Sequence, residues 1–82
     1  MDEPRTVEAG RNRSLKLIRR GEVCRVWIAS DADGAFSEEL TAAAIRAGLV
    51  PDRSKTGRQL ADMCGVEVFT AAAVERKSIT GS

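Results

Sequence analysis

Five positively charged side chains and no negative one lie between Gly10 and Gly21, in the segment GRNRSLKLIRRG. Guanidinium and ammonium groups at this density suit contact with phosphate, which gives every nucleic-acid backbone its negative charge. Asn12 and Arg13 add amide and guanidinium groups, which can form paired hydrogen bonds with base edges. The segment is therefore a candidate nucleic-acid-binding surface.

The alternative interpretation is a solvated helix face, where charged side chains usually lie. Two features argue against it. The segment contains no acidic residue that could form i,i+4 ion pairs, and its first cations lie at the amino end, where the helix dipole disfavours positive charge. Asn12 is also a good N-cap, a role that needs no ligand. We favour a phosphate-rich partner over the solvated face.

Asp31 and Asp33 form a second candidate site, because two carboxylates following a buried strand could hold Mg²⁺. Aspartate is also a preferred turn residue. The sequence has no histidine, no Gly-rich phosphate loop and no nucleophile beside a base. We favour the turn and expect no catalytic, metal or cofactor site; a small Mg²⁺-dependent enzyme is the weaker alternative.

Size and composition predict one thinly cored domain: the chain has 82 residues, 43% of them hydrophobic and 30% charged. No apolar run approaches the roughly 20 residues of a membrane span, and the first residues do not resemble a signal peptide. We therefore expect a cytoplasmic monomer that does not bind membranes. Cys24 and Cys64 are expected to be buried small hydrophobes, since neither a disulfide nor a metal site is favoured without further cysteines or histidine.

The formal net charge of +1 conceals an uneven distribution. Residues 11–25 carry six cations and one anion, whereas residues 31–52 carry five anions and one cation. A local field of this kind steers a charged ligand more than the total charge does.

The basic segment is predicted to be a helix over residues 12–20. Leu15 and Ile18 share one face, while Arg13, Lys16 and Arg20 form a stripe on the opposite face at positions i, i+3 and i+7. We expect Asn12 or Ser14 to cap this helix and Gly21 to follow its last turn.

The other predicted elements alternate between strand and helix. They are a short helix or strand around Val7, a central strand at Val23–Ala29, a helix over 38–47 capped by Ser37, a strand at Leu49–Pro51, a helix over 57–64 between Thr56 and Gly65, a loop at 66–69 and a strand at 70–74. This order predicts a three-layer α/β/α sandwich with a small mixed central sheet, in which helix starts and strand ends meet at one edge. Its core would span residues 7–74; we expect the last strand to be short or at an edge, and residues 75–82 to be a frayed tail.

Three motifs in register resemble the ribosomal protein L-seven-Ae and L-thirty-e family, especially its short bacterial members. GRNRSLKLIRRG resembles the family's opening signature, ASDAD resembles its acidic turn, and QLADMCGVEVFTAAAV is similar to the stretch that runs from the last helix through a Val-Glu-Val loop into the final strand. The resemblance covers residues 10–74 with comparable spacings.

The resemblance implies binding to structured RNA, most often a kink-turn with tandem G·A pairs, in a ribosomal or ribosome-associated role. It implies close backbone approach at Gly10, contacts of Asn12 and Arg13 with base edges, and contacts of Lys16 and Arg20 with phosphates. Val66, Glu67 and Val68 occupy the position of the loop that covers the RNA bulge. These assignments fit the physics of RNA, whose base edges are accessible only where the helix is distorted.

The sequence departs from the family pattern at several positions. Arg13 stands where the family has Glu, Gln or Lys, which alters the available hydrogen bonds and the expected base preference. Arg11 adds charge and bulk beside the RNA. Ala61 and Phe69 stand where the family often has glycine. Phe69 is either a core anchor or a stacking platform, and we favour the core because it borders a strand. These departures keep open a second alternative, a protein-interaction module that has lost RNA binding.

Overall fold

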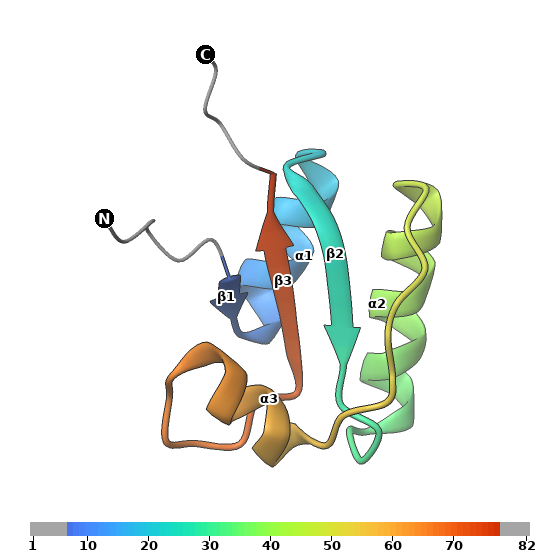
Figure 1. Ribbon diagram of the computed structural model, residues 1–82. Coiled ribbons are helices and arrows are strands. Elements are labelled where there is room, and N and C mark those ends of the chain that lie inside the picture. The colour runs from blue at the N-terminus through green and yellow to red at the C-terminus, as the bar shows by residue number, and fades with distance from the viewer. Residues whose placement is uncertain (1–6, 78–82) are drawn as a thin grey trace, which may run out of the picture.

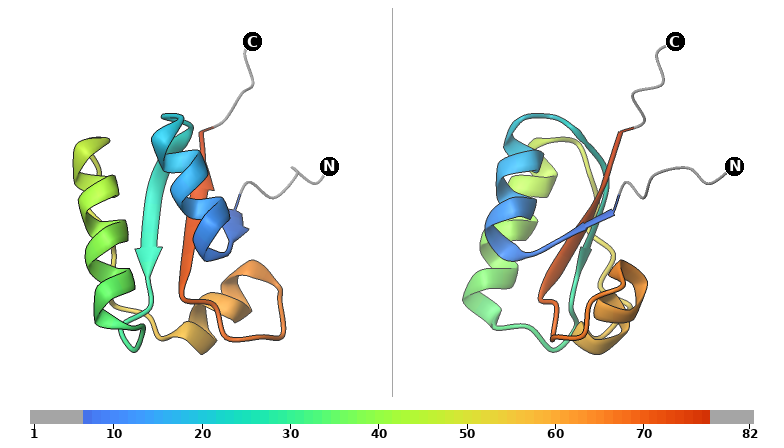
Figure 2. Two further views of the ribbon diagram at one scale, coloured as in Figure 1. Left: turned by 180° about the vertical axis from the view of Figure 1, so that it is seen from behind. Right: turned by 90° about the vertical axis from the view of Figure 1, so that its left-hand side faces the viewer.

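The computed structural model describes residues 7–77, which form three helices around an antiparallel three-stranded sheet. Helices α1 and α2 lie on one face of the sheet and α3 lies on the other (Figures 1 and 2). The predicted three-layer α/β/α arrangement is therefore confirmed. The elements are β1 (Val7–Ala9), α1 (Arg11–Arg19), β2 (Val23–Ile28), α2 (Gly34–Arg46), α3 (Gly57–Cys64) and β3 (Ala72–Arg76).

The last strand is the central one, because the strand order is β1-β3-β2. The expectation of an edge position is wrong, and so is the expectation of a frayed tail from Glu75. Glu75 pairs with Val7 on one side and Arg25 on the other, and the N–H of Lys77 donates to the carbonyl of Glu22 at 2.8 Å. Residues 78–82, the rest of that expected tail, lie outside the described residues.

Strand β2 lies on the other side of β3, so it is not the central strand that its apolar sequence predicted. Its second half is nevertheless covered on both faces as expected, because Val26 and Ile28 belong to one core cluster and Trp27 to the other. Its pairing shifts between Val23 and Arg25, and Cys24 and Arg25 are exposed there. An irregularity of this kind turns side chains away from the regular alternation. Cys24 is therefore not the buried hydrophobe we expected; its thiol lies 3.5 Å from the carbonyl of Glu75.

The predicted strand at Leu49–Pro51 does not form. The segment runs along the outer edge of β2 and pairs only at Asp52, which forms a parallel bridge with Trp27. Pro51 has no N–H to contribute to a ladder, which limits the pairing. The three strands are therefore antiparallel and not mixed as predicted; among the described residues this isolated bridge is the one parallel pairing.

Two hydrogen bonds from Ser54 lower the pKa of Asp52, the larger effect coming from the Ser54 hydroxyl and the smaller from its N–H. The positive charges of Lys55 and Arg25 lower this pKa further.

The helix starts decide which side chains reach the surface. Helix α2 begins four residues earlier than predicted, because Asp33 rather than Ser37 caps it by accepting from the N–H of Phe36 at 3.2 Å. Ser37 is buried inside the helix. Helix α3 has its predicted bounds, with a capping box between Thr56 and Gln59 and a left-handed Gly65 after its end.

The core lies on both faces of the sheet. The larger cluster packs α1 and α2 on the sheet and includes the fully buried Leu40, Ile28 and Val74. The smaller cluster lies beneath α3 and contains Trp27 and Leu60. Within residues 7–77, no helix has both the length and the apolar character needed to cross a membrane.

Candidate nucleic-acid interface

Gly10 forms the turn between β1 and α1. Its φ of 118° and ψ of 148° lie in a region that favours glycine. Its N–H donates to the carbonyl of Ala72 at 3.0 Å, so the start of α1 lies beside the first residue of β3. Neither Asn12 nor Ser14 caps α1, contrary to our expectation; the N-cap position is Gly10, no side chain caps the helix, and Ser14 is fully buried.

Arg11, Asn12 and Arg13 are exposed on the first turn of α1. The Nη2 of Arg11 lies 3.3 Å from the Oε1 of Glu39 on α2, and its guanidinium lies 5.2 Å from the centre of the Phe36 ring. The Nε of Arg13 lies 3.3 Å from the Oε1 of Glu8 on β1. Acidic residues of α2 and β1 thus pair with two arginines of the basic segment. The absence of acidic residues within the segment is therefore weaker support for an anionic ligand than we expected from the sequence.

The predicted basic stripe exists on one side of α1. Arg13, Lys16 and Arg20 line a common hollow of about 100 Å³, with Leu17 among its other lining residues. Among the residues that the structure describes, Lys16 and Arg20 take part in no ion pair. Their positive charges are therefore available to a ligand.

Two further elements contribute to this hollow. Arg76 on β3 and Glu22 before β2 also line it, and neither was predicted from the sequence as part of the site. The sequence feature that could have indicated the position of Arg76 is its spacing of two residues from Val74. Residues two apart in a strand share a face, so a charged residue two positions after a core valine points to the side on which α1 packs.

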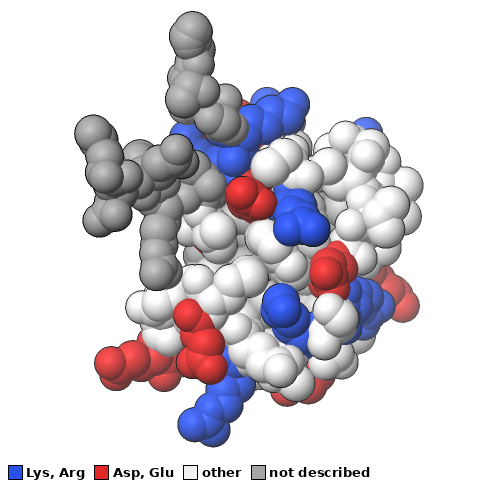
Figure 3. All heavy atoms as spheres, in the orientation of Figure 1, with Lys and Arg blue, Asp and Glu red and all other residues white. Residues whose placement is uncertain are grey.

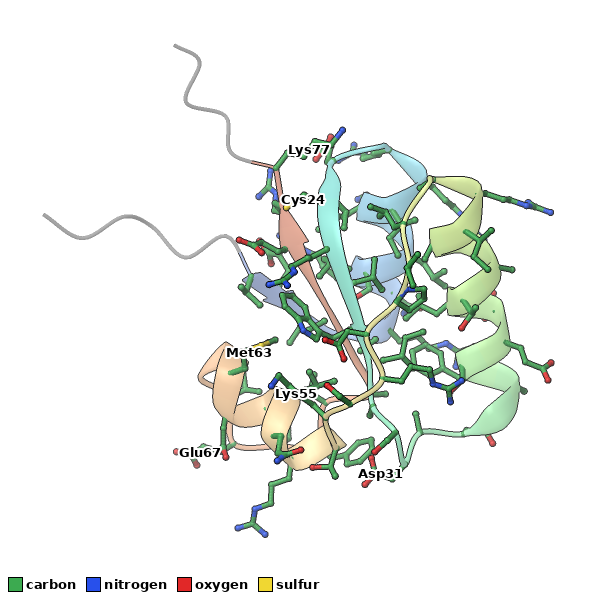
Figure 4. All side chains as sticks on the ribbon, turned by 45° about the vertical axis from the view of Figure 1, so that its right-hand side comes forward. Cys24, Asp31, Lys55, Met63, Glu67 and Lys77 are labelled. Atoms are coloured by element: carbon green, nitrogen blue, oxygen red, sulfur yellow. The ribbon has the colours of Figure 1, made fainter. Side chains whose placement is uncertain are left out.

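The loop after α3 exposes apolar side chains. Val66 is at the surface, Val68 is 70% exposed and Phe69 is 57% exposed, so Phe69 is not the core anchor we expected. The Phe69 ring instead lies against the backbone of Gly57, where a Cβ atom would overlap it. Glu67 is exposed on the outer part of the loop (Figure 4).

The loop is held against the start of α3. The N–H of Thr70 donates to the carbonyl of Gly57 at 3.1 Å, and the Thr70 hydroxyl donates to the carbonyl of Val68 at 3.2 Å. A hollow of about 570 Å³ lies between the loop and α3. The loop therefore presents its apolar side chains from a defined position.

The start of α1 and the loop lie at the same end of the sheet. The hydrogen bond from Gly10 to Ala72 connects the start of α1 to β3, the strand that follows the loop. Figures 1 and 2 show the start of α1 and the loop near the beginning of β3. Lys16 and Arg20 lie further along the helix, displaced from Asn12 by about 6 and 12 Å along the helix axis at a rise of 1.5 Å per residue. The two predicted parts of the site thus lie at the same end of the sheet, α1 on one face and the loop with α3 on the other, and Lys16 and Arg20 lead away from the loop.

Asp31 and Asp33 act as hydrogen-bond acceptors for backbone. The Oδ1 of Asp31 accepts from the N–H of Gly57 at 2.9 Å, at the start of α3 (Figure 4), and Asp33 caps α2. Within residues 7–77, no three potential metal ligands come together. The arrangement supports the turn interpretation, because each carboxylate is oriented by a different helix start.

The face of the molecule that carries α3 is mixed in charge. Figure 3 shows the face that carries α3, where basic and acidic side chains are interspersed with wide uncharged areas. Helix α1 lies behind the sheet in this orientation (Figure 1), so its basic stripe belongs to the opposite side.

Comparison with solved structures supports the fold. The "15.5kD RNA binding protein" of Giardia lamblia superposes with a TM-score of 0.80 and 29% identity, over 90% of this chain and 62% of that protein. A protein of unknown function from Bacillus halodurans C superposes with a TM-score of 0.80 and 15% identity, over 89% of this chain and 73% of its own. The chain thus spans less than two thirds of the Giardia protein. No protein-family model matches the sequence, and no curated protein sequence does.

Proposed function

We propose that this chain is an RNA-binding protein of the ribosomal protein L-seven-Ae and L-thirty-e family, and that it recognises kink-turn RNA. The observation that carries the proposal is the proximity of the α1 start and the apolar loop at one end of the sheet. The three sequence motifs and the likeness to the Giardia protein support it independently. The chain would bind ribosomal or ribosome-associated RNA as a monomeric domain without catalytic activity.

The proposed interface divides the work between base contacts and phosphate contacts. Asn12 and Arg13 reach base edges at the G·A pairs, and Gly10 lets the RNA approach the backbone. Lys16 and Arg20 contact phosphates, while Val66 and Val68 pack on the unstacked bulge. Arg11 and Glu67 lie at the margins of this surface.

Binding would stabilise the kinked RNA because the protein contacts that conformation better than the extended one. The ordered loop and the fixed start of α1 hold both parts of the interface in place before the RNA arrives. Arg13 must exchange its contact with Glu8 for one with RNA, and exposed ion pairs of this kind are worth only about 0 to 1 kcal/mol. The exchange therefore does not prevent binding.

Paired substitutions test the proposal. Asn12→Ala should reduce the preference for kink-turn RNA over the same RNA without G·A pairs by about tenfold, because a paired base contact is lost. Lys16→Ala should weaken binding to both RNAs and lower the slope of log affinity against log salt by about 1. Fluorescence anisotropy over several salt concentrations measures both quantities.

A straight RNA duplex serves as the reference ligand in this experiment. If the unmodified protein binds straight and kinked RNA equally, kink-turn recognition is wrong. If it binds neither, the protein-interaction module becomes the better account of the chain.

A further inference from the structure

Four cations from two elements surround the hollow beside α1. Arg13, Lys16 and Arg20 come from the α1 segment, and Arg76 comes from the end of β3. The carboxylates of Glu8 and Glu22 lie among them. Four cations against two carboxylates leave the cluster positively charged, which is the condition for binding an anion.

Arg76 reaches this place because of the strand periodicity. Ala72 and Val74 on the same face of β3 belong to the core beneath α1 and α2, and Arg76 is the next residue on that face. Its side chain is 35% exposed and lies beside the carboxyl end of α1, at the surface of the protein. Lys77, the next residue, is exposed at the same end of the sheet but does not line the hollow (Figure 4).

The two carboxylates position Arg76 without neutralising the cluster. The Nη1 of Arg76 lies 3.5 Å from the Oε2 of Glu8, and its Nη2 lies 3.8 Å from the Oε1 of Glu22. Charge-assisted hydrogen bonds are usually about 2.7 to 2.9 Å long, so both contacts are loose. Glu8 is shared with Arg13, which further divides its charge. A ligand with stronger acceptors could displace both carboxylates.

We propose that this hollow binds a phosphate of the RNA backbone, and that Glu8 and Glu22 occupy the guanidinium of Arg76 until that phosphate replaces them. The proposal rests on the RNA-binding function proposed above. A phosphodiester offers two charged oxygens, which match the fork of a guanidinium. The hollow has a volume of about 100 Å³, which is room enough for one phosphate group.

The position of the hollow favours an RNA backbone over a free anion. Lys16 and Arg20 follow one side of α1 away from Asn12 and Arg13, so a strand that leaves the G·A pairs along this helix meets them in succession. Arg76 adds a contact from the sheet beside this path, where it shares Glu8 with Arg13. The hollow is thus a second anchor, along the basic extension, for the RNA stem.

Opposite changes in affinity test the proposal. Arg76→Gln should weaken kink-turn RNA binding by about threefold to tenfold and lower the salt slope by about 0.7 to 0.9, while the preference for kinked over straight RNA stays unchanged. Arg76→Lys should restore the salt slope. Glu22→Gln should strengthen binding up to about fivefold, because the competing carboxylate is removed.

Matched controls separate this mechanism from general charge and folding effects. Lys77→Gln removes a neighbouring cation outside the hollow, and Glu38→Gln removes an exposed carboxylate on α2; both should change affinity less than twofold. Circular dichroism and thermal unfolding establish that each variant is folded. A purely structural role for the Arg76–Glu22 pair predicts that both Arg76→Gln and Glu22→Gln weaken binding, which would overturn the proposal.

Four other outcomes would also overturn it. Glu38→Gln could strengthen binding as much as Glu22→Gln, which would indicate a general charge effect. Arg76→Gln could leave affinity and salt slope unchanged while Lys16→Ala weakens binding, in which case the proposed function stands and only the second anchor is wrong. Inorganic phosphate could stabilise the unmodified protein but not the Arg76→Gln variant, with RNA binding unaffected; the hollow would then be a free-anion site. If the protein binds no RNA at all, both proposals fail.

Discussion

At the scale of single residues, the candidate interface depends on backbone conformation as much as on charge. Gly10 connects β1 to α1 with a φ of 118°, and its N–H bonds to β3. A residue with a Cβ adopts this conformation only with strain. The space around Gly10 is open, since a Cβ there would lie 3.9 Å from the nearest atom, the Cβ of Arg13. Conformation rather than crowding therefore requires glycine.

Gly10→Ala should lower the free energy of unfolding by about 1 to 3 kcal/mol, because the added methyl group strains the backbone. Urea unfolding measures the change. Gly34→Ala is the matched control: Gly34 is the first residue of α2, has no positive φ, and a Cβ added to it would meet no atom within 4 Å. That substitution should leave stability equal or slightly higher. Equal losses at both positions would contradict the conformational account.

At the scale of elements, the apolar loop and α3 form one unit. Phe69 lies on the backbone of Gly57, and Thr70 bonds to the carbonyl of the same glycine. The Phe69 side chain thus holds the loop against α3. It also places an aromatic ring, 57% exposed, beside the proposed RNA bulge site.

Gly57→Ala should lower the free energy of unfolding by about 1 kcal/mol, the low end for overpacking, because the displaced Phe69 ring can turn toward solvent. In the Phe69→Ala background the same substitution should have much less effect. Urea unfolding of the two single variants and the double variant measures this coupling. Additive effects would show that the ring does not rest on Gly57 in solution.

The helix α1 also depends on other elements for its charge balance. Glu39 on α2 and Glu8 on β1 each contact one of its arginines, while Lys16 and Arg20 remain without an ion-pair partner within residues 7–77. The helix is therefore partly neutralised at its start and most strongly charged along its side. This distribution suits base contacts at the start and phosphate contacts along the side.

At the scale of the whole molecule, a net charge of +1 is compatible with strong attraction of an anion, because the charges are separated in space. The face shown in Figure 3 is mixed, and the side with α1 carries the basic hollow. The three-layer fold separates these faces by a sheet. RNA bound on the proposed surface would contact α1, the turn at Gly10 and the loop before β3 together.

Binding to three segments that are distant in sequence should stabilise the entire fold. Kink-turn RNA at 100 times its dissociation constant should add about 2.7 kcal/mol and raise the unfolding temperature by about 10 °C or more. The shift should shrink as salt is added at constant RNA concentration, since phosphate contacts weaken. Differential scanning calorimetry measures both. A G·A-free RNA that produces an equal shift would argue against recognition of the kink.

Sequence patterns were sufficient to predict the three-layer class, the bounds of α3 and the basic stripe on α1. These follow from local signals: helical periodicity, a capping box and glycines at helix ends act within a few residues. Sequence also placed a turn at Asp31 and Asp33, although it could not show that each carboxylate serves a different helix.

Three features could not be predicted from the sequence and are seen only in the folded chain: the central position of β3, the exposure of Cys24 and the contact of Phe69 with Gly57. It also brought Arg76 and Glu22 to the basic hollow, and Gly10 to Ala72. Strand order and register depend on pairings between segments up to 68 residues apart, such as Val7 with Glu75, and no local pattern encodes them. The residues of the proposed surface can therefore largely be predicted from the sequence, whereas the shape of that surface depends on contacts that form only when the chain has folded.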